Sequence, residues 1–152
     1  TNTFGPNDKY DKSNSHFLPA LIKKIYEVEK RNLNYIKIWG TGKPKREIMY
    51  VDDIADACVF FMNKKTSHNL INIGTGNEDT IKDITKLFLK TLLPNKKIKI
   101  IFDKSKPNGI KRKVLDISLA KKRLGWSPKF DRKIGLEKTI EYFDSLLKRE
   151  LI

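Results

Sequence analysis

The stretch Leu70–Lys90, LINIGTGNEDTIKDITKLFLK, contains two element types whose order decides the fold. Leu70–Ile73 is a short, mainly apolar run closed by Gly74-Thr75-Gly76, as expected of a buried strand that ends in a turn. Thr80 and Asp83 have the spacing of a capping box, and apolar residues recur after them at helical intervals. The stretch therefore predicts a strand followed by a helix, the repeating unit of an α/β fold.

The same alternation extends in both directions from this stretch. Further strands are predicted at Thr1–Phe4, Asn34–Trp39 and Ile98–Phe102, and further helices at Phe17–Val28, Ser118–Leu124 and Leu136–Leu147. A polar loop is expected at Asn7–Asn14, and Gly125 is expected to stop the short helix Ser118–Leu124. The chain shows no internal repeat, so the fold class that we predict is α/β.

Two further predicted helix starts carry capping signals. Ser15 is the candidate N-cap of the helix that begins at Phe17, with Pro19 in its first turn. Asp52 or Asp53 is the candidate N-cap of another helix. Four apolar residues of that second helix share one face: Ile54, Cys58, Phe61 and Met62. We expect this face, including the Cys58 thiol, to pack in the core.

Length and composition exclude several protein classes. The chain has 152 residues, enough for one modest domain, and its 10% aromatic residues exclude a disordered tail. No apolar run is long enough to span a membrane. The single cysteine, Cys58, cannot form an internal disulfide, so a cytoplasmic location is expected. The first residue is Thr1 rather than Met, which suggests a processed chain or a piece of a longer protein.

The chain is strongly basic, with 32 Lys and Arg residues against 18 Asp and Glu and a net charge of +14. Lysine suits solvated surfaces and general attraction of anions more than planar readout of bases. A nucleic-acid-binding module is one alternative, because this charge would attract a phosphate backbone. Zinc-finger spacing, an aromatic RNA-binding strand and a helix-turn-helix signature are all missing, so we expect no nucleic-acid partner. His16, His68 and Cys58 lack metal-ligand spacing, so we expect no metal.

Two glycine-containing segments resemble phosphate-binding loops but depart from them. The third glycine of a dinucleotide fingerprint that began at Gly74 would fall at Asp79. A P-loop around Gly40-Thr41-Gly42-Lys43 would need Ser or Thr at Pro44. Both segments are therefore predicted to be turns. Tyr26 and Lys30 match the Tyr-x-x-x-Lys spacing of short-chain dehydrogenases, but chance explains the match in a chain so rich in lysine.

Catalytic and binding chemistry is suggested by one histidine and one loop. His16 stands at a predicted helix start, where the positive helix end would lower the pKa of its imidazole and keep it neutral for proton transfer. An ordinary surface histidine fits the pattern equally well. In Trp39–Glu47, WGTGKPKRE, the Trp39 ring can cover a sugar or base and the Arg46 guanidinium can grip a diphosphate. A solvated turn with Trp39 packed inward is the alternative.

Seven segments occur together in an order that is typical of one family. They are TNTFGP (1–6), NSHFLPALIKK (14–24), WGTGKPKRE (39–47), YVDD (50–53), NIGTG (72–76), FDKSKPNG (102–109) and LGW (124–126). In this order they resemble the GDP-L-fucose synthases, a family of extended short-chain dehydrogenase/reductases with an NAD(P)-binding Rossmann fold. The pattern R-E-x-x-Y-V-D-D is common among extended dehydrogenases, whereas NSHFLPALI followed by WGTGKPKRE is much more specific.

The resemblance implies an NADP(H)-dependent enzyme. Such enzymes epimerise C3 and C5 of GDP-4-dehydro-6-deoxy-D-mannose and reduce its C4 ketone, which yields GDP-L-fucose. The resemblance assigns cofactor contacts to four residues: Thr1, Asn2, Thr3 and His16. It makes His16 also the catalytic acid of epimerisation, and it assigns substrate contacts to Lys24, Trp39, Arg46 and Asn108. Asn108 stands where the family commonly has Asp, although an amide can still hydrogen-bond a hydroxyl or a base edge.

The resemblance also defines what the chain does not contain. The family's Gly-rich cofactor loop, its Ser, its Tyr-x-x-x-Lys pair and its epimerisation Cys all precede the matched segments. Tyr26, Lys30 and Cys58 fall outside that register. Residues 1–152 are therefore expected to be the C-terminal half of such an enzyme, a GDP-sugar-binding lobe with the last Rossmann strands, inactive alone and a homodimer when complete. Another extended dehydrogenase acting on a different nucleotide sugar, and the nucleic-acid-binding module, are the open alternatives.

Overall fold

Parallel pairing between distant strands organises the chain, as a computed structural model of residues 1–10 and 15–149 shows. β1 (Asn2–Phe4) pairs with β4 (Ile48–Tyr50), and β2 (Tyr35–Trp39) pairs with β6 (Lys99–Asp103). The two-residue strand β3 (Lys45–Arg46) lies between β5 (Asp79–Thr80) and β7 (Arg112–Lys113). Parallel pairs need long crossovers, and helices supply them here. The predicted α/β class is therefore confirmed.

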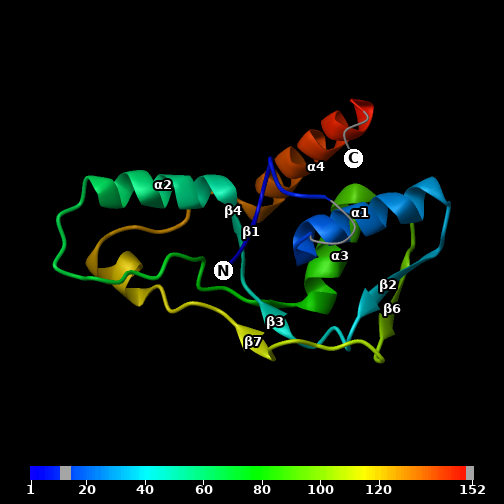
Figure 1. The fold of residues 1–152 in the computed structure, drawn as a ribbon, viewed down its shortest axis with the longest axis horizontal. Helices are drawn as coiled ribbons and strands as arrows, with labels where there is room; N and C mark the ends of the chain where they lie inside the picture. The colour runs from blue at the N-terminus through cyan, green and yellow to red at the C-terminus, as the bar shows by residue number, and fades with distance from the viewer. Residues whose placement is uncertain (11–14, 150–152) are drawn as a thin grey trace.

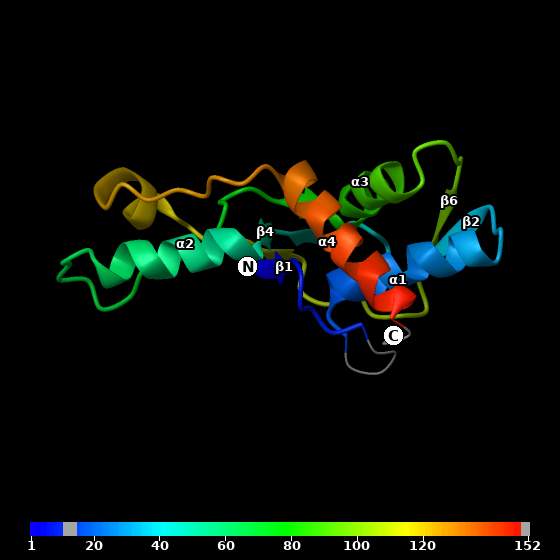
Figure 2. The ribbon, with the colours of Figure 1, turned by 90° about the horizontal axis from the view of Figure 1, so that it is seen from above.

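Three helices and the β2–β6 pair form one end of the molecule, which we call the packed region (Figures 1 and 2). The helices are α1 (Phe17–Lys30), α3 (Ile81–Leu92) and α4 (Arg132–Lys148). Phe88 of α3 is fully buried, with its ring edge-on to Phe4 at 6.4 Å between centroids. Phe143 of α4 packs against Tyr26 of α1 and against Tyr10. Aromatic contacts thus join α3 to β1 and α4 to α1 within this core.

The other end of the molecule, the α2 region, comprises α2 (Val51–Met62), residues 63–76 and the short helix η1 (Leu119–Arg123) with Trp126. Within the described parts of the chain, the hydrophobic core of this region has four buried residues: Met49, Ala57, Ala120 and Trp126. Strand β4 separates the two cores, because successive side chains of a strand point to opposite faces. Ile48 and Tyr50 belong to the larger core, and Met49 belongs to the smaller one.

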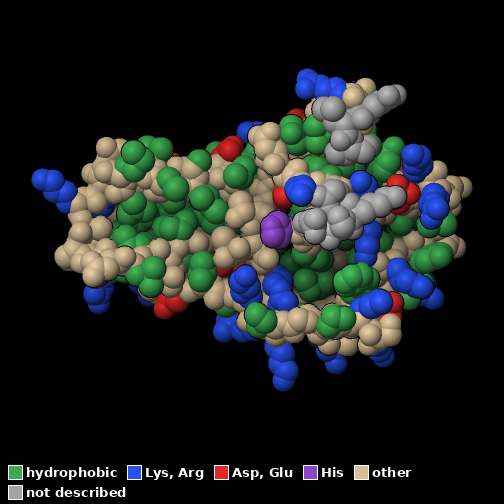
Figure 3. All heavy atoms as spheres, viewed as in Figure 1, with side chains coloured by type: hydrophobic (Ala, Val, Ile, Leu, Met, Phe, Trp, Pro, Cys, Tyr) green, Lys and Arg blue, Asp and Glu red, His purple; other side chains and the backbone are tan. Residues whose placement is uncertain are grey.

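Two sequence predictions fail in the α2 region. Leu70–Ile73 is not a strand, and Leu70 is 79% exposed, since no strand of the described residues pairs with this segment. The predicted apolar face of α2 is in the core only in part: Ile54 and Phe61 pack against the smaller core, whereas the Cys58 thiol is exposed and Met62 is 84% exposed. On the face shown in Figure 3, hydrophobic side chains gather over this end of the molecule. The expected burial required packing partners that the described chain does not provide.

The capping predictions were correct for one helix and wrong for two. The Thr80 hydroxyl accepts a hydrogen bond from the Asp83 amide at 3.1 Å and caps α3 as predicted. Ser15 does not cap α1, because the N-cap residue is His16. In α2 the N-cap is Tyr50. The Asp53 carboxylate instead accepts the amide of Lys129 at 2.6 Å, which anchors the chain that leads into α4.

The remaining predicted elements are found within a few residues of their expected bounds. The strands at Thr1–Phe4, Asn34–Trp39 and Ile98–Phe102 correspond to β1, β2 and β6. The short strands β3, β5 and β7 were not predicted, because each pairs over only two residues. The predicted polar loop Asn7–Asn14 extends into residues 11–14, outside the described residues. No helix among the described residues is long and apolar enough to cross a membrane.

Candidate functional site

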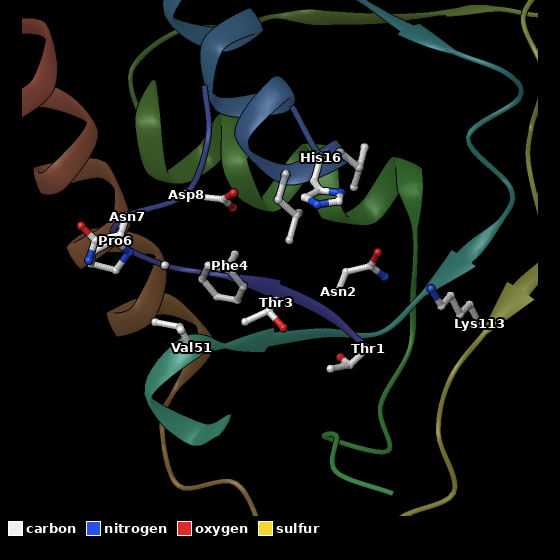
Figure 4. A pocket seen from close by; sticks show the side chains of 13 residues that line it. Thr1, Asn2, Thr3, Phe4, Pro6, Asn7, Asp8, His16, Val51 and Lys113 are labelled. Atoms are coloured by element: carbon white, nitrogen blue, oxygen red, sulfur yellow. The ribbon is translucent and has the colours of Figure 1, made fainter. Parts of the chain in front are cut away.

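A pocket of about 430 Å³ lies between β1 and the start of α1 (Figure 4). Its lining includes all four residues to which the resemblance assigns cofactor contacts: Thr1, Asn2, Thr3 and His16. Strand β1 contributes Asn2 and Thr3, and the residue preceding α1 contributes His16. Lys113, from the end of β7, completes the wall on the other side. The pocket has the size of a small-molecule site, and its polar groups come from three elements.

Polar atoms at this pocket have hydrogen-bonding capacity left for a ligand. The Thr1 Oγ1 atom is buried and has no hydrogen-bond partner among the described residues. The Asn2 side chain donates a hydrogen bond from Nδ2 to the Glu47 carbonyl at 2.9 Å, which leaves the Asn2 Oδ1 atom available. Buried polar atoms without partners are costly, so a ligand that bonds the Thr1 hydroxyl would relieve an unfavourable state. This pocket therefore fits part of a polar, nucleotide-like cofactor.

His16 is positioned at the pocket by its backbone rather than by its ring. Its carbonyl accepts the Ala20 amide at 3.0 Å in the first turn of α1, while its imidazole makes no capping hydrogen bond. Figure 4 shows the ring at the start of α1, on the side of β1 towards which Asn2 also extends. The side chain is exposed. An imidazole that is fixed at its Cα and free at its nitrogens suits proton transfer to a bound molecule.

The Gly74-Thr75-Gly76 turn binds a carboxylate of the protein itself. Glu47 is fully buried, and its Oε1 accepts the amides of Thr75 and Gly76 at 2.5 and 2.7 Å. Its Oε2 accepts the Leu115 amide at 3.1 Å. These donors are the kind that hold phosphates in cofactor loops, but here an internal anion occupies them. The prediction of a turn rather than a cofactor loop is therefore confirmed, and Glu47 holds this turn against β4.

Trp39, at the end of β2, presents an exposed ring with two cations near it. The side chain is 61% exposed, so the inward-packed alternative is wrong. The ammonium groups of Lys24 and Lys106 lie 5.6 and 5.8 Å from the ring centroid. Burial lowers the pKa of Lys24. Lys24 and Trp39 also line a groove of about 550 Å³ beside α1. An aromatic platform flanked by ammonium groups can bind a ring that carries phosphates.

The loop after Trp39 is held in place by Asn108. The Asn108 Oδ1 atom accepts the Thr41 amide at 2.7 Å and the Thr41 hydroxyl at 2.8 Å. Gly40 has a positive φ of 76°, and a Cβ there would approach Asn108 Oδ1 to 2.5 Å, so only glycine fits. The carbonyl side of the Asn108 amide is therefore engaged within the protein. Its Nδ2 donor is the group left for a ligand.

Arg46 links this loop to the pocket at β1. Its Nη1 donates to the carbonyls of Lys45 and Ile110 at 2.8 and 2.7 Å, which leaves Nε and Nη2 for an anion. Arg46 lies on β3 directly beside Lys113 of β7, which lines the pocket. The Ile110 carbonyl that Arg46 bonds lies two residues after Asn108, and Asn108 bonds Thr41, two residues after Trp39. A line of neighbouring residues therefore leads from the pocket through Lys113, Arg46 and Asn108 to the Trp39 platform.

Sequence reasoning missed three residues of this arrangement. Glu47 was included only as part of a loop, although it is buried and anchors the turn. Lys113 stands in the basic run Lys111-Arg112-Lys113, and no sequence pattern distinguishes it from its neighbours. Lys106 lies in the segment FDKSKPNG (102–109), for which the sequence assigned a role only to Asn108. Tyr26 and Lys30 form a cation–π pair on α1, as expected of a chance match. No cluster of metal-ligating side chains occurs in residues 1–10 and 15–149.

Several known proteins are similar to this chain in sequence or in fold. Residues 1–74 match the NAD dependent epimerase/dehydratase family. The chain is 39% identical to a GDP-L-fucose synthase of Sinorhizobium fredii and 40% identical to a GDP-L-colitose synthase of Yersinia pseudotuberculosis, over 95% and 93% of its length. It covers 45% and 46% of those relatives, less than half of each. The structure of a GDP-L-fucose synthetase from Naegleria fowleri bound to NADP has the same fold, with a TM-score of 0.84 at 22% identity over 97% of this chain and 46% of that one.

Proposed function

We propose that this chain, a homologue of the extended short-chain dehydrogenase/reductases, forms the substrate-binding part of a GDP-L-fucose synthase. The complete enzyme would use NADPH to convert GDP-4-dehydro-6-deoxy-D-mannose into GDP-L-fucose. The observation that carries the proposal is the line of neighbouring residues from the Thr1–Thr3 and His16 pocket to the Trp39 platform. This line has room for a cofactor at one end and a nucleotide sugar at the other.

The proposed cofactor end is the pocket at β1. Thr1, Asn2 and Thr3 would contact NADP(H), and the unpartnered Thr1 hydroxyl supports this role. The bound cofactor supplies the hydride that reduces the C4 ketone. The C4 ketone acidifies the protons on C3 and C5, so epimerisation needs a group that returns a proton to carbon. His16 would hold and deliver that proton, because its ring lies at the pocket and is not used for capping.

The proposed substrate end is the surface between Trp39 and Arg46. Trp39 would cover one face of the nucleotide sugar, and Lys24 would place a positive charge beside it. The free Nε and Nη2 donors of Arg46 would bond the diphosphate in a fork. Asn108 would offer its Nδ2 donor, since its Oδ1 already holds Thr41. Diphosphate binding would thus fix the sugar ring relative to His16.

Surface features of the α2 region support a second, cofactor-binding half. The β1–β4 sheet has only two strands in the described chain, and so small a sheet gains stability from further strands or helices. The α2 face with Met62, together with Leu70, is exposed apolar surface that a packed enzyme would cover. Residues 1–152 would accordingly correspond to the C-terminal half, and the Leu70–Ile73 segment would become a strand against the other half.

The test compares the 152-residue chain with a chimera that joins it to the cofactor-binding half of the Sinorhizobium fredii relative. Both are mixed with NADPH and GDP-4-dehydro-6-deoxy-D-mannose, and NADPH absorbance and the product sugar are followed. The chimera is expected to form GDP-L-fucose, and the chain alone is expected to consume no NADPH. A His16→Gln chimera should lose epimerisation and still bind NADPH, with an affinity only a few-fold lower, because the contacts of Thr1, Asn2 and Thr3 remain. Turnover by the 152-residue chain alone would contradict the proposal.

A second substrate class is favoured by one comparison. The chain is as similar to the GDP-L-colitose synthase as to the fucose synthase. A GDP-sugar without one of the sugar hydroxyls would place the same diphosphate on Arg46 and the same nucleoside on Trp39. Offering the chimera both 4-dehydro sugars in competition distinguishes the two candidates by the ratio of their kcat/KM values.

A further inference from the structure

A groove outside the proposed active site concentrates positive charge. It lies between α3 and β6, has a volume of about 710 Å³, and is lined by six lysines: Lys82, Lys86, Lys90, Lys96, Lys97 and Lys99. None of its lining residues is acidic. Lys86 and Lys96 have carboxylates only at 3.9 and 3.8 Å, from exposed Asp83 and Glu29. Surface pairs of this kind neutralise little charge, so the groove retains a strong positive potential.

The lysines of α3 are arranged in a line. Lys82, Lys86 and Lys90 recur every four residues, which places them on one face of the helix at intervals of about 6 Å along its axis. Lys96, Lys97 and Lys99 form the opposite wall, in the segment that enters β6. A single phosphate can contact only one or two of these groups. A linear chain of anionic groups can contact all of them.

The floor of the groove excludes two other kinds of ligand. Leu89 and Leu93 are buried, and none of the large exposed hydrophobic side chains of the described residues lines the groove. The groove therefore has no apolar side chain that could insert into a membrane. Its one aromatic ring, Phe102, packs against the backbone of Gly42 and is therefore not free to stack on a base. Lysine ammonium groups bind phosphates as point charges, without the planar fork of arginine.

From these contacts we infer that the α3–β6 groove binds a linear polyphosphate, a chain of phosphate groups without bases. The ligand lies along α3, with phosphates on Lys82, Lys86 and Lys90 and on the lysines of the opposite wall. The binding is electrostatic and releases counterions, so salt weakens it steeply. It does not depend on the GDP-sugar site, because no groove residue lies on the line from the β1 pocket to Trp39.

The test measures binding of end-labelled inorganic polyphosphate to the 152-residue chain by fluorescence anisotropy at several salt concentrations. Removing three groove charges, as K82Q/K86Q/K90Q, is expected to weaken binding about tenfold or more and to flatten the salt dependence. The matched control K121Q/K122Q/R123Q removes three charges from exposed positions of η1 and is expected to weaken binding by only about twofold. Circular dichroism checks that both variants are folded.

Several outcomes overturn the inference. Equal losses in the two triple variants mean that the net charge of the chain, not the groove, attracts polyphosphate. Tighter binding of single-stranded RNA of equal charge means that the site takes nucleic acid, and groove-dependent binding of phosphatidylglycerol vesicles means that it takes a membrane. If K82Q/K86Q/K90Q unfolds, the single variants K86Q and K121Q provide the same comparison, because each removes one charge. Equal affinity of these two variants for polyphosphate also overturns the inference.

Discussion

The packed region and the α2 region meet at β4 but differ in how completely they bury their apolar side chains. In the packed region, three helices cover the strands, and Phe88, Ile25 and Leu136 are almost fully buried. In the α2 region, one helix rests on a core of four buried residues, while Met62 and Leu70 face outward. The first region closes its own core, whereas the second leaves apolar side chains exposed, the surface that the proposed cofactor-binding half would cover. The proposed ligand site lies on the packed region and on the strands that join the two regions.

The largest expected effect comes from a core substitution in the packed region. Phe88→Ala should lower the free energy of unfolding by about 3–5 kcal/mol, because it removes a fully buried ring and leaves a cavity. Met62→Ala in the α2 region should change it by less than about 0.5 kcal/mol, because that side chain is exposed. Urea denaturation of the 152-residue chain measures both values. Similar losses for the two variants would mean that the regions do not differ as described.

The same Met62→Ala substitution can be compared in two contexts. In the chimera with a cofactor-binding half, the Met62 side chain is expected to become buried, and the substitution should then cost about 1.5–3 kcal/mol. An unchanged, small effect in the chimera would show that the other half does not cover this face of α2.

The second expected effect concerns the connection between the regions. Glu47→Gln should lower the free energy of unfolding by about 2–3 kcal/mol, because it replaces a buried carboxylate that accepts hydrogen bonds from Thr75, Gly76 and Leu115. Glu137→Gln is the control, since its exposed pair with Lys133 should contribute less than about 0.5 kcal/mol. The measurement is again urea denaturation. If Glu47→Gln lowers the free energy of unfolding no more than Glu137→Gln does, Glu47 does not anchor the turn.

The same contrast explains how far the sequence predicts the structure. In the packed region, helical periodicity and the Thr80–Asp83 capping box locate α1, α3 and α4 correctly, because each element is buried against others of this chain. In the α2 region, the same rules predict burial of Cys58 and a strand at Leu70–Ile73, and both predictions are wrong. Apolar periodicity shows that a surface is to be covered. It does not show whether the covering partner lies within the described residues.

The residues of the candidate site were likewise predicted only where a local sequence motif identified them. Thr1, Asn2, Thr3 and His16 were named from the resemblance, and one pocket gathers all four. Trp39 and Lys24 were also named, and they lie together. Lys106 and Glu47 were not assigned roles, because their positions depend on contacts between segments far apart in the chain. Such contacts leave no local pattern in the sequence.

A third, smaller effect tests whether the strands that join the regions bind the diphosphate. Arg46→Ala in the chimera should weaken GDP-sugar binding about tenfold and leave NADPH binding nearly unchanged, because it removes a forked phosphate contact. Isothermal titration calorimetry with each ligand separately provides the two affinities. Met62→Ala, in the α2 region, should leave GDP-sugar affinity unchanged and serves as the control. Equal losses of affinity for the two ligands in Arg46→Ala would contradict the assignment.

The smallest expected effect is a pH dependence from Lys24, in the packed region. Burial lowers the pKa of Lys24, so its ammonium loses its proton at a lower pH than an ordinary lysine. A lysine is charged below its pKa, and its attraction for the diphosphate is therefore present at low pH and lost as the pH rises through the lowered value. GDP affinity of the chimera should fall a few-fold over this range. Lys24→Arg should keep its affinity, because a guanidinium stays protonated there. Calorimetric titration with GDP at increasing pH compares the two proteins, and coinciding profiles would mean that Lys24 does not contact the diphosphate.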